Sequence, residues 1–532
     1  MTASSDLAAA AKAVALAQGI VDRAALHLRS NGGVEGNQSV AYDLAHTAAA
    51  VANARVALDY GEMGEVEARI ACGAAADAIH DLAARLLGRE ASWGASTGDL
   101  GADGAMDVVR DYRSPAFVAS LASEPGPRHL DGDFELVQDT FRRFAEDRIK
   151  PVAEHIHRTN ADIPEEVISG LAELGTFGLS VPEEYGGFSA GGESEYMAMV
   201  VATEELSRVS LGAAGSLLTR PEILTRALVN GGTEEQKKEW LPKLAAGNLM
   251  SAVAVTEPDF GSDAGAVQVS ATAVDGGDAY VVNGVKTWCT FAGRADVLML
   301  LARTDPDRSL RHRGLSLFIV PKERGEGHGF AFTQDGGGKI EGRAIDTIGY
   351  RGMHSYEVAF DNWSVPAANL VGGDAGKGRG FYLTVQGFEN GRLQTAARAI
   401  GVMQAAYEAA LEYASNRVVF GNPILDFELT RVKLGRMAIV IQSARQFMYH
   451  VARLMGSGAG SMEASMVKAY VCRAAEWVTR EALQIHGGMG YAEEFPVSRY
   501  FVDARVLSIF EGADEVLAMR VIARRLVEGS EG

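Results

Sequence analysis

The chain has 532 residues, too many for a single hydrophobic core, so several domains are expected. Its apolar share of 47% is typical of a globular protein, and a formal charge of −19 disfavours nucleic acid or an anionic membrane as the main partner. No run approaches the roughly 20 apolar residues of a membrane span, and no signal-peptide pattern opens the chain. Three widely spaced cysteines give no disulfide or zinc pattern, so we expect a cytoplasmic protein without a metal site.

The first 95 residues are predicted to form an extra helical domain. Ala, Val and Leu recur at helical spacing, as in the run 45–51, and few β-branched runs interrupt them. Gly and Pro then become frequent over 96–132. This change in composition indicates a linker or an ordered crossing over the surface.

A second helical region is predicted over 133–248. Apolar residues recur every three to five positions from Phe134 to Ile149, which gives one apolar helix face. Pro164 and the two glutamates after it indicate a helix start. Thr233, with Gln236 three residues later, forms a capping-box pattern.

The periodicity becomes that of strands over 249–372. Strands are predicted at 267–274, 279–282, 298–302, 315–320 and 357–360. Asn283-Gly284 predicts a two-residue turn, because both residue types tolerate positive φ.

Long helices return over 373–532, in the C-terminal part of the chain. They are predicted at about 377–416, 427–456, 461–485 and 513–528. Helical and strand regions are segregated, which predicts an α+β fold rather than a parallel βαβ sheet. No GxGxxG follows a strand to open a helix, which counts against a Rossmann cofactor site.

Three motifs contain residue types that suit a cofactor, and each has a simpler structural interpretation. The polar loop 255–263 could hold a ring edge or a pyrophosphate, or be an ordinary turn. Trp288 and Thr290 could border a flat heteroaromatic ring, or the Trp could be a core residue. The glycine pair 487–488 allows close approach of a cofactor, or is a helix C-cap that follows a structural His486.

A fourth motif places Glu511 between an apolar run and Gly512, just before the last helix. Apolar surroundings disfavour the charged form of a carboxylate and so make it a stronger base. A solvated acid at a helix start is the alternative interpretation.

In this order, the four motifs and the layout closely resemble the acyl-CoA dehydrogenase family over about 133–528. The segments 181–187, 232–237 and 416–421 belong to the same resemblance. It implies a helical domain, a central β-barrel or β-sandwich domain and a C-terminal four-helix bundle, with the extra helical domain in front. It also implies FAD as cofactor, an acyl-CoA substrate and an electron-transfer flavoprotein as redox partner.

The resemblance assigns cofactor and substrate contacts to individual residues. Within the subunit it implies FAD contacts from Val255, Thr256, Ser262, Trp288, Thr290, Ala513 and Glu515. A second set would bind the FAD of a neighbouring subunit in a homodimer or homotetramer: Arg417, Phe420, Gln484, Gly487 and Gly488. Substrate contacts would come from Ser262, Glu389, Arg392 and Gly512.

Family members place their catalytic glutamate at one of two positions. One lies beside Arg392, where this chain has Gly391, and the other is the Glu of the Glu-Gly motif, here Glu511. The resemblance therefore implies that Glu511 removes the α-proton of a CoA thioester while a hydride leaves Cβ for the flavin. Ala513 stands where Thr is usual and Glu428 where a flavin-contacting Gln is common, but neither removes this chemistry.

The added N-terminal domain and the segments 219–223, 349–353 and 392–398 resemble the branch of the family that oxidises (2S)-methylsuccinyl-CoA to mesaconyl-CoA. A buried substrate carboxylate needs a charge-assisted partner, and the candidates are Arg220, Arg226 and Arg351, each of which could instead form a surface ion pair.

Several other functions stay open from the sequence. The substrate could be butyryl-CoA or isobutyryl-CoA, and an acyl-CoA oxidase would share the fold and the base. A monooxygenase of this fold normally lacks the glutamate. A catalytically silent flavin-binding paralogue would be expected to lose motifs that are retained here.

Overall fold

Helices occupy both ends of the chain and strands its middle, which confirms the predicted α+β class. The computed structural model describes residues 3–274 and 276–529. One compact unit comprises Met1–Asp139 with Thr395–Gly532, and the other comprises Thr140–Gln394. The boundaries between the five predicted segments remain a prediction. Among the described residues, no helix is both long and apolar enough to cross a bilayer.

The N-terminal part of the first unit is built on three long helices, α1 (Ala3–Ser30), α3 (Gln38–Gly61) and α4 (Glu65–Leu86). Two short helices, α2 (Gly33–Gly36) and α5 (Glu90–Trp93), flank them. Every residue from 44 to 54 in α3 is buried. A helix that is buried all round must be covered on more than one side.

The segment 96–132, predicted as a linker or an ordered surface crossing, contains three short helices. These are η1 (Thr97–Gly104), α6 (Ala105–Tyr112) and α7 (Pro115–Ala119). The Ser114 side chain caps α7 by accepting from the Phe117 amide, and Pro115 occupies the first turn. Gly104 and Pro115 therefore mark an end and a start of these short helices.

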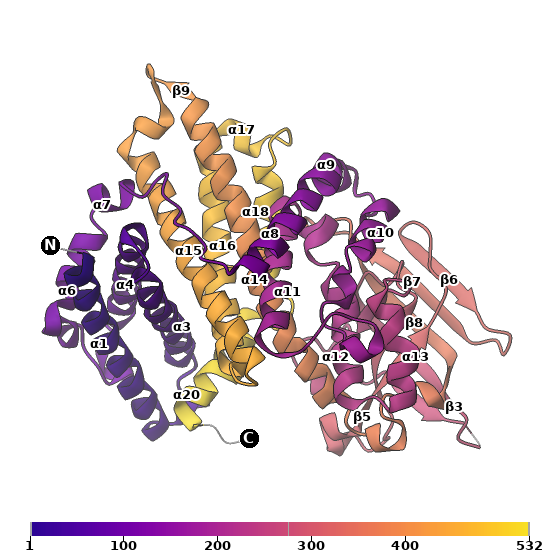
Figure 1. The fold of residues 1–532 in the computed structure, drawn as a ribbon. Helices are drawn as coiled ribbons and strands as arrows, with labels where there is room; N and C mark the ends of the chain where they lie inside the picture. The colour runs from indigo at the N-terminus through magenta and orange to yellow at the C-terminus, as the bar shows by residue number, and fades with distance from the viewer. Residues whose placement is uncertain (1–2, 275, 530–532) are drawn as a thin grey trace. The chain divides into compact units, whose positions relative to one another are not determined.

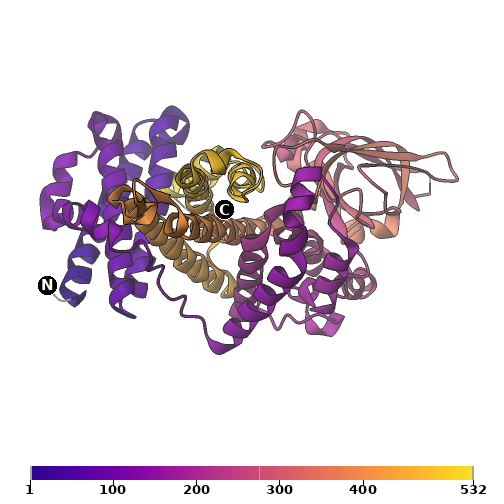
Figure 2. The same ribbon diagram turned by 90° about the horizontal axis from the view of Figure 1, so that it is seen from above.

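The C-terminal helices of the first unit cover the other side of α3. They comprise α14 (Gly380–Asn416, from residue 395 on), α15 (Glu428–Gly456), α16 (Ser461–His486), α17 (Gly488–Tyr491) and α18 (Val497–Leu507). The last helix is α19 (Asp514–Val516), η11 (Leu517–Ala523) and α20 (Arg524–Glu528). Contacts of α3 with α15, α16 and η11 join the extra helices to this bundle (Figures 1 and 2).

The second unit combines helices with one curled sheet. Its longer helices are α9 (Lys150–Thr159), α10 (Glu165–Glu173), α11 (Gly192–Val209), α12 (Thr219–Gly231) and α13 (Glu234–Ala245). The predicted capping box is present, because the Thr233 side chain accepts from the Gln236 amide and the Gln236 side chain accepts from the Thr233 amide.

Eight strands form the sheet, in the order β1-β4-β2-β3-β8-β7-β6 with β5 paired to β4. They are β1 (Ser251–Ala254), β2 (Ser270–Ala273), β3 (Ala279–Thr290), β4 (Val297–Arg303), β5 (Leu315–Pro321), β6 (Gly329–Thr333), β7 (Lys339–Ile345) and β8 (Ser355–Pro366). Most pairs are antiparallel, while β4 pairs in parallel with β1 and at one position with β2.

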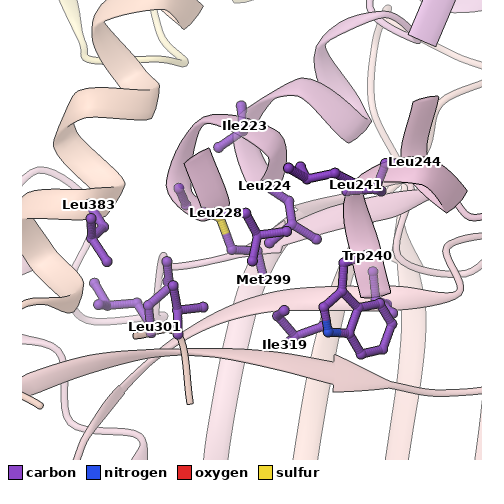
Figure 3. Packing of buried hydrophobic residues seen from close by; sticks show 14 of the residues in the cluster. Ile223, Leu224, Leu228, Trp240, Leu241, Leu244, Met299, Leu301, Ile319 and Leu383 are labelled. Carbon is purple, nitrogen blue, oxygen red and sulfur yellow. The ribbon is translucent and has the colours of Figure 1, made fainter. Parts of the chain in front are cut away.

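A buried apolar cluster joins the helices of this unit to its sheet (Figure 3). Leu224 and Leu228 of α12 and Leu241 of α13 meet Met299 of β4 and Ile319 of β5. All seven residues of β4 are buried, which explains why this strand lacks an alternating pattern.

Asn283-Gly284 is a bulge inside β3 and not the predicted turn. The strand pairs with β8 on both sides of this point, with a register shift between Val282 and Gly284. Gly284 has a φ of 130°, and Asn283 Oδ1 accepts from the Asn362 amide of β8 at 2.8 Å. Asn and Gly tolerate positive φ, which suits a two-residue turn. In this strand the same property accommodates the extra residue of a bulge.

Candidate active site

A buried lysine joins the first two motifs within residues 140–394. Lys286 of β3 donates to the Val255 carbonyl at 2.9 Å and to the Glu257 carboxylate at 2.8 Å. The Thr287 amide donates to the Thr256 carbonyl at 2.8 Å. The loop that begins at Val255 is therefore fixed against the strand that carries Trp288.

The ion pair between Lys286 and Glu257 is almost fully buried. Glu257 also accepts from the amides of Gln268 and Val269, at 2.7 and 2.8 Å. Burial lowers the pKa of Lys286, and the charge and hydrogen bond of Glu257 oppose that shift. Because each buried charge has a partner, the pair specifies one conformation of the loop.

Trp288 projects from the sheet. Its side chain is 54% exposed, so the alternative of a core tryptophan does not hold. The backbone has a φ of 56° at Trp288, within a register shift between Lys286 and Cys289, whereas Cys289 is buried. The irregular strand thus turns the indole out of the sheet.

Hydroxyl groups lie close to this indole in the chain. Thr290 Oγ1 is 2.9 Å from Ser355 Oγ of β8. The next residue, Phe291, donates its amide to the His354 carbonyl at 2.8 Å. An exposed indole followed by a hydroxyl pair suits a flat ring with polar edges, so these residues fit an isoalloxazine. Ser262 lies further along the fixed loop and is exposed.

The segment 389–392, predicted to contact the substrate, lies in α14 against a buried acid. Both Asn390 and Gln394 donate to the Glu222 carboxylate of α12. Thr219 donates to the Gln394 side-chain oxygen at 2.6 Å. The start of α12, which includes Arg220, is therefore held next to this part of α14.

The three candidate arginines have different surroundings. Arg226 pairs with Glu195 and, at 3.3 Å, with Glu222. Arg351 donates to the carbonyls of Thr347 and His157, at 3.1 and 2.9 Å. These contacts give both side chains a role within the protein. Arg220 is 4% exposed, and its Nε donates to the Ser216 carbonyl over 3.4 Å.

Glu511 lies on a tight turn between α18 and α19, in the unit of residues 1–139 and 395–532. Glu511 and Gly512 both have left-handed backbones, with φ of 54° and 93°. The side chain of Lys468, in α16, donates to the Gly512 carbonyl at 2.6 Å. The Asp514 amide donates to the Ser508 carbonyl at 3.0 Å, which closes the turn.

The residues expected to reach a neighbouring subunit are exposed in the same unit. Arg417 precedes a two-stranded hairpin, β9 (Val418–Val419) and β10 (Asn422–Pro423), and Phe420 at its tip is 92% exposed. Gln484, Gly487 and Gly488 are exposed at the end of α16. A protruding apolar side chain of this size is typical of an interaction site.

His486 has a structural role, as the simpler interpretation of its motif predicted. Its Nδ1 is 2.8 Å from the Ala482 carbonyl, and its ring stacks on Tyr413 with centroids 4.3 Å apart. Burial lowers the pKa of His486, which keeps the ring neutral.

Sequence reasoning missed the residues that hold these loops. Lys286, Glu257 and Lys468 are charged residues that are buried in the fold. A lysine isolated in an apolar run was the available signal, as in Met-Val-Lys-Ala around Lys468. Buried lysines need partners, but their partners lie far away in the sequence.

Comparison with known proteins identifies the family. The models of the N-terminal, middle and C-terminal domains of acyl-CoA dehydrogenase match residues 132–248, 252–363 and 378–527. A (2S)-methylsuccinyl-CoA dehydrogenase of Cereibacter sphaeroides is 46% identical over 404 residues, which cover 76% of this chain and 71% of that protein. The chain is an acyl-CoA dehydrogenase family member. It is thus an FAD-dependent flavoprotein, an oxidoreductase that acts on the CH–CH bond of an acyl-CoA.

Solved structures show the same relationship. A glutaryl-CoA dehydrogenase in complex with glutaryl-CoA matches with a TM-score of 0.68 at 29% identity, covering 76% of this chain and 97% of that one. A chain from a study of the electron transferring flavoprotein of Acidaminococcus fermentans matches with a TM-score of 0.66 at 31% identity, covering 75% and 99%. All the family models begin at or after residue 132, so the extra N-terminal helices lie outside the matched domains.

Replacing Lys286 by methionine is expected to destabilise this acyl-CoA dehydrogenase and weaken its retention of FAD. The change leaves the Glu257 carboxylate buried without its cation, which should lower the free energy of unfolding by about 3–5 kcal/mol. Urea unfolding and the flavin-to-protein absorbance ratio measure both effects. The double variant with Glu257→Gln should recover part of the loss, and an unchanged Lys286→Met protein would contradict the assigned role of the pair.

Proposed function

We propose that the protein oxidises a short, branched acyl-CoA that carries a second carboxylate, (2S)-methylsuccinyl-CoA, to mesaconyl-CoA. The observation that carries this proposal is the 46% identity, over 404 residues, to the methylsuccinyl-CoA dehydrogenase of Cereibacter sphaeroides. The helical domain that precedes residue 132 and the segments 219–223, 349–353 and 392–398, which resemble this branch of the family, support it as well.

Glu511 is the proposed base. A thioester α-proton is too weakly acidic for a carboxylate in water, so the site must stabilise the enolate and hold the base in place. The turn fixed by Lys468 and closed by Asp514 holds the Glu511 backbone, and Glu511 itself is half-buried. FAD, when bound, supplies the acceptor for the hydride that leaves Cβ.

The chain's own residues would hold the cofactor in two groups. Val255, Thr256, Ser262, Trp288 and Thr290 would line the flavin and its pyrophosphate, and Ala513 and Glu515 would contribute from the first turn of the last helix. A second subunit would add Arg417, Phe420, Gln484, Gly487 and Gly488, which makes the active unit at least a homodimer. The exposure of Trp288 and of Phe420 supports this arrangement.

Arg220 is our candidate for the partner of the substrate carboxylate. Arg220 is a buried cation at the start of α12, where Thr219 binds Gln394 of α14. The adjoining segment of α14 contains Glu389 and Arg392, which with Ser262 and Gly512 are proposed to contact the CoA thioester.

An electron-transfer flavoprotein is the proposed electron acceptor. The similarity to a chain from a study of the electron transferring flavoprotein of Acidaminococcus fermentans supports it. A dehydrogenase reduces an artificial dye and forms little hydrogen peroxide, whereas an oxidase that uses oxygen forms peroxide. Measuring both products therefore distinguishes the two acceptors.

Replacing Glu511 by glutamine is expected to abolish turnover and leave the fold intact. The amide has nearly the same shape but cannot take up the α-proton, so the rate should fall by about three orders of magnitude or more. Stopped-flow bleaching of the flavin by the acyl-CoA measures this step, with FAD content as the control for folding. Flavin reduction at the rate of the unchanged enzyme would exclude Glu511 as the base.

Replacing Arg417 by alanine is expected to weaken FAD retention and the oligomer together, because its guanidinium is proposed to meet a cofactor phosphate across the subunit boundary. Light scattering after size-exclusion chromatography gives the mass in solution, and absorbance gives the flavin content. The nearby exposed Arg431, on α15, offers a matched Arg431→Ala control. Equal mass and flavin content in both variants would contradict the role of Arg417.

A substrate panel tests the proposed carboxylate. We expect kcat/KM for (2S)-methylsuccinyl-CoA to exceed the values for butyryl-CoA and isobutyryl-CoA by about 100-fold, because a buried arginine left without its anion loses a charge-assisted pair. Equal turnover of the uncharged acyl groups would refute the carboxylate proposal and leave the family assignment unchanged.

A further inference from the structure

The extra N-terminal helices bind the segment that follows Glu511. Tyr42 donates its hydroxyl to Oδ2 of Asp514 at 2.5 Å, and Nε2 of His46 lies 3.1 Å from the same oxygen. Both residues belong to α3, one helical turn apart, so their side chains lie on one face. Asp514 is only three residues after Glu511.

The three side chains form a mostly buried polar group. His46 is buried, and the side chain of Asp514 is 12% exposed. The rings of Tyr42 and His46 meet edge to face with centroids 4.6 Å apart. The guanidinium of Arg473, in α16, lies 6.0 Å from the centre of the Tyr42 ring. A carboxylate this enclosed keeps its position only while its hydrogen-bond partners remain.

Asp514 and Tyr42 both have shifted pKa values. Burial raises the pKa of Asp514, but the His46 and Tyr42 hydrogen bonds and the charges of His46 and Arg473 outweigh it, so the pKa lies below its usual range. Burial and the hydrogen bond to Asp514 raise the pKa of Tyr42 to about 12. Asp514 is therefore an anion, and Tyr42 is a neutral donor to it.

A short covalent and hydrogen-bonded path connects Asp514 to Glu511. The Asp514 amide closes the turn onto the Ser508 carbonyl, and Lys468 binds the Gly512 carbonyl inside it. The left-handed backbone of Glu511 is unfavourable for a residue with a side chain, and it persists only where the surroundings fix it. Displacing Asp514 would remove one of the contacts that fix it.

We propose that the extra N-terminal domain positions the active site. Tyr42 and His46 hold Asp514, and Asp514 holds the turn that places the carboxylate of Glu511. Neither Tyr42 nor His46 touches the substrate in this proposal, so both are positioning residues. The proposal rests on Glu511 being the base. It gives a role to the added helices, which lie outside the matched family domains because these begin at residue 132.

The test is Tyr42→Phe in the full-length flavoenzyme, together with Asp514→Asn and the double variant. Tyr42→Phe keeps the ring and removes only the donor. We expect the rate of flavin reduction at saturating acyl-CoA to fall about tenfold, with KM and FAD content unchanged, because a small displacement of a reacting group slows the chemical step. The double variant should be no slower than Asp514→Asn alone, since both changes act through one contact.

A second contact between the extra helices and the last helix provides the control. Glu35, in α2, pairs with Arg520 of η11, and both side chains are exposed. Glu35→Gln also removes a bond between the extra helices and the last helix, but it leaves Asp514 untouched. This variant should reduce flavin at the rate of the unchanged enzyme.

Two results would overturn the proposal. One is a Tyr42→Phe enzyme with an unchanged rate, and the other is a rate that falls only in proportion to lost FAD or to a lower melting temperature. If Glu511 is not the base, the Glu511→Gln enzyme will remain active, and this result distinguishes failure of the proposed function from failure of the positioning role. An inactive Glu511→Gln combined with an unaffected Tyr42→Phe rejects only the positioning role.

Discussion

The backbone at Glu511 and Gly512 is the constraint on which the first unit depends. A left-handed conformation costs a residue with a side chain about 1–3 kcal/mol, and Glu511 has a φ of 54°. Lys468 and Asp514 stabilise this turn at two separate points. The long helices α16 and α3 supply Lys468 and the two residues that bind Asp514, so their packing holds the backbone of this turn in place.

Buried charges fix the loop that begins at Val255 in the second unit by the same principle. Lys286 binds both a backbone carbonyl and the Glu257 carboxylate. Replacing a buried ion pair by apolar groups often leaves stability unchanged, whereas removing one partner is costly. Such a pair therefore contributes more to a single loop conformation than to net stability. In both units, a buried lysine fixes a loop by binding one of its backbone carbonyls.

The extra N-terminal domain is continuous with the bundle that it covers. Asn53 of α3 donates to Ser443 of α15 in a buried position, and Tyr60 donates to the Pro127 carbonyl. An apolar helix such as α3 gains most of its stability from this packing. Tyr42 and His46, in the first turns of α3, contact Asp514. The domain thus packs on the bundle through a large apolar surface, and this packing brings one small polar group close in sequence to the proposed base.

The sequence by itself determined the order of helices and strands, the family's motifs and Glu511 as the candidate base, because periodicity and short motifs are local properties. It predicted a turn at Asn283-Gly284 and a linker or ordered crossing over 96–132, because positive φ and frequent Gly or Pro suit several structures equally well. Only the tertiary structure decided that the first is a bulge and that the second contains three short helices. It also decided the contact between Tyr42 and Asp514, since residues so far apart in the chain meet only when packing brings their helices together.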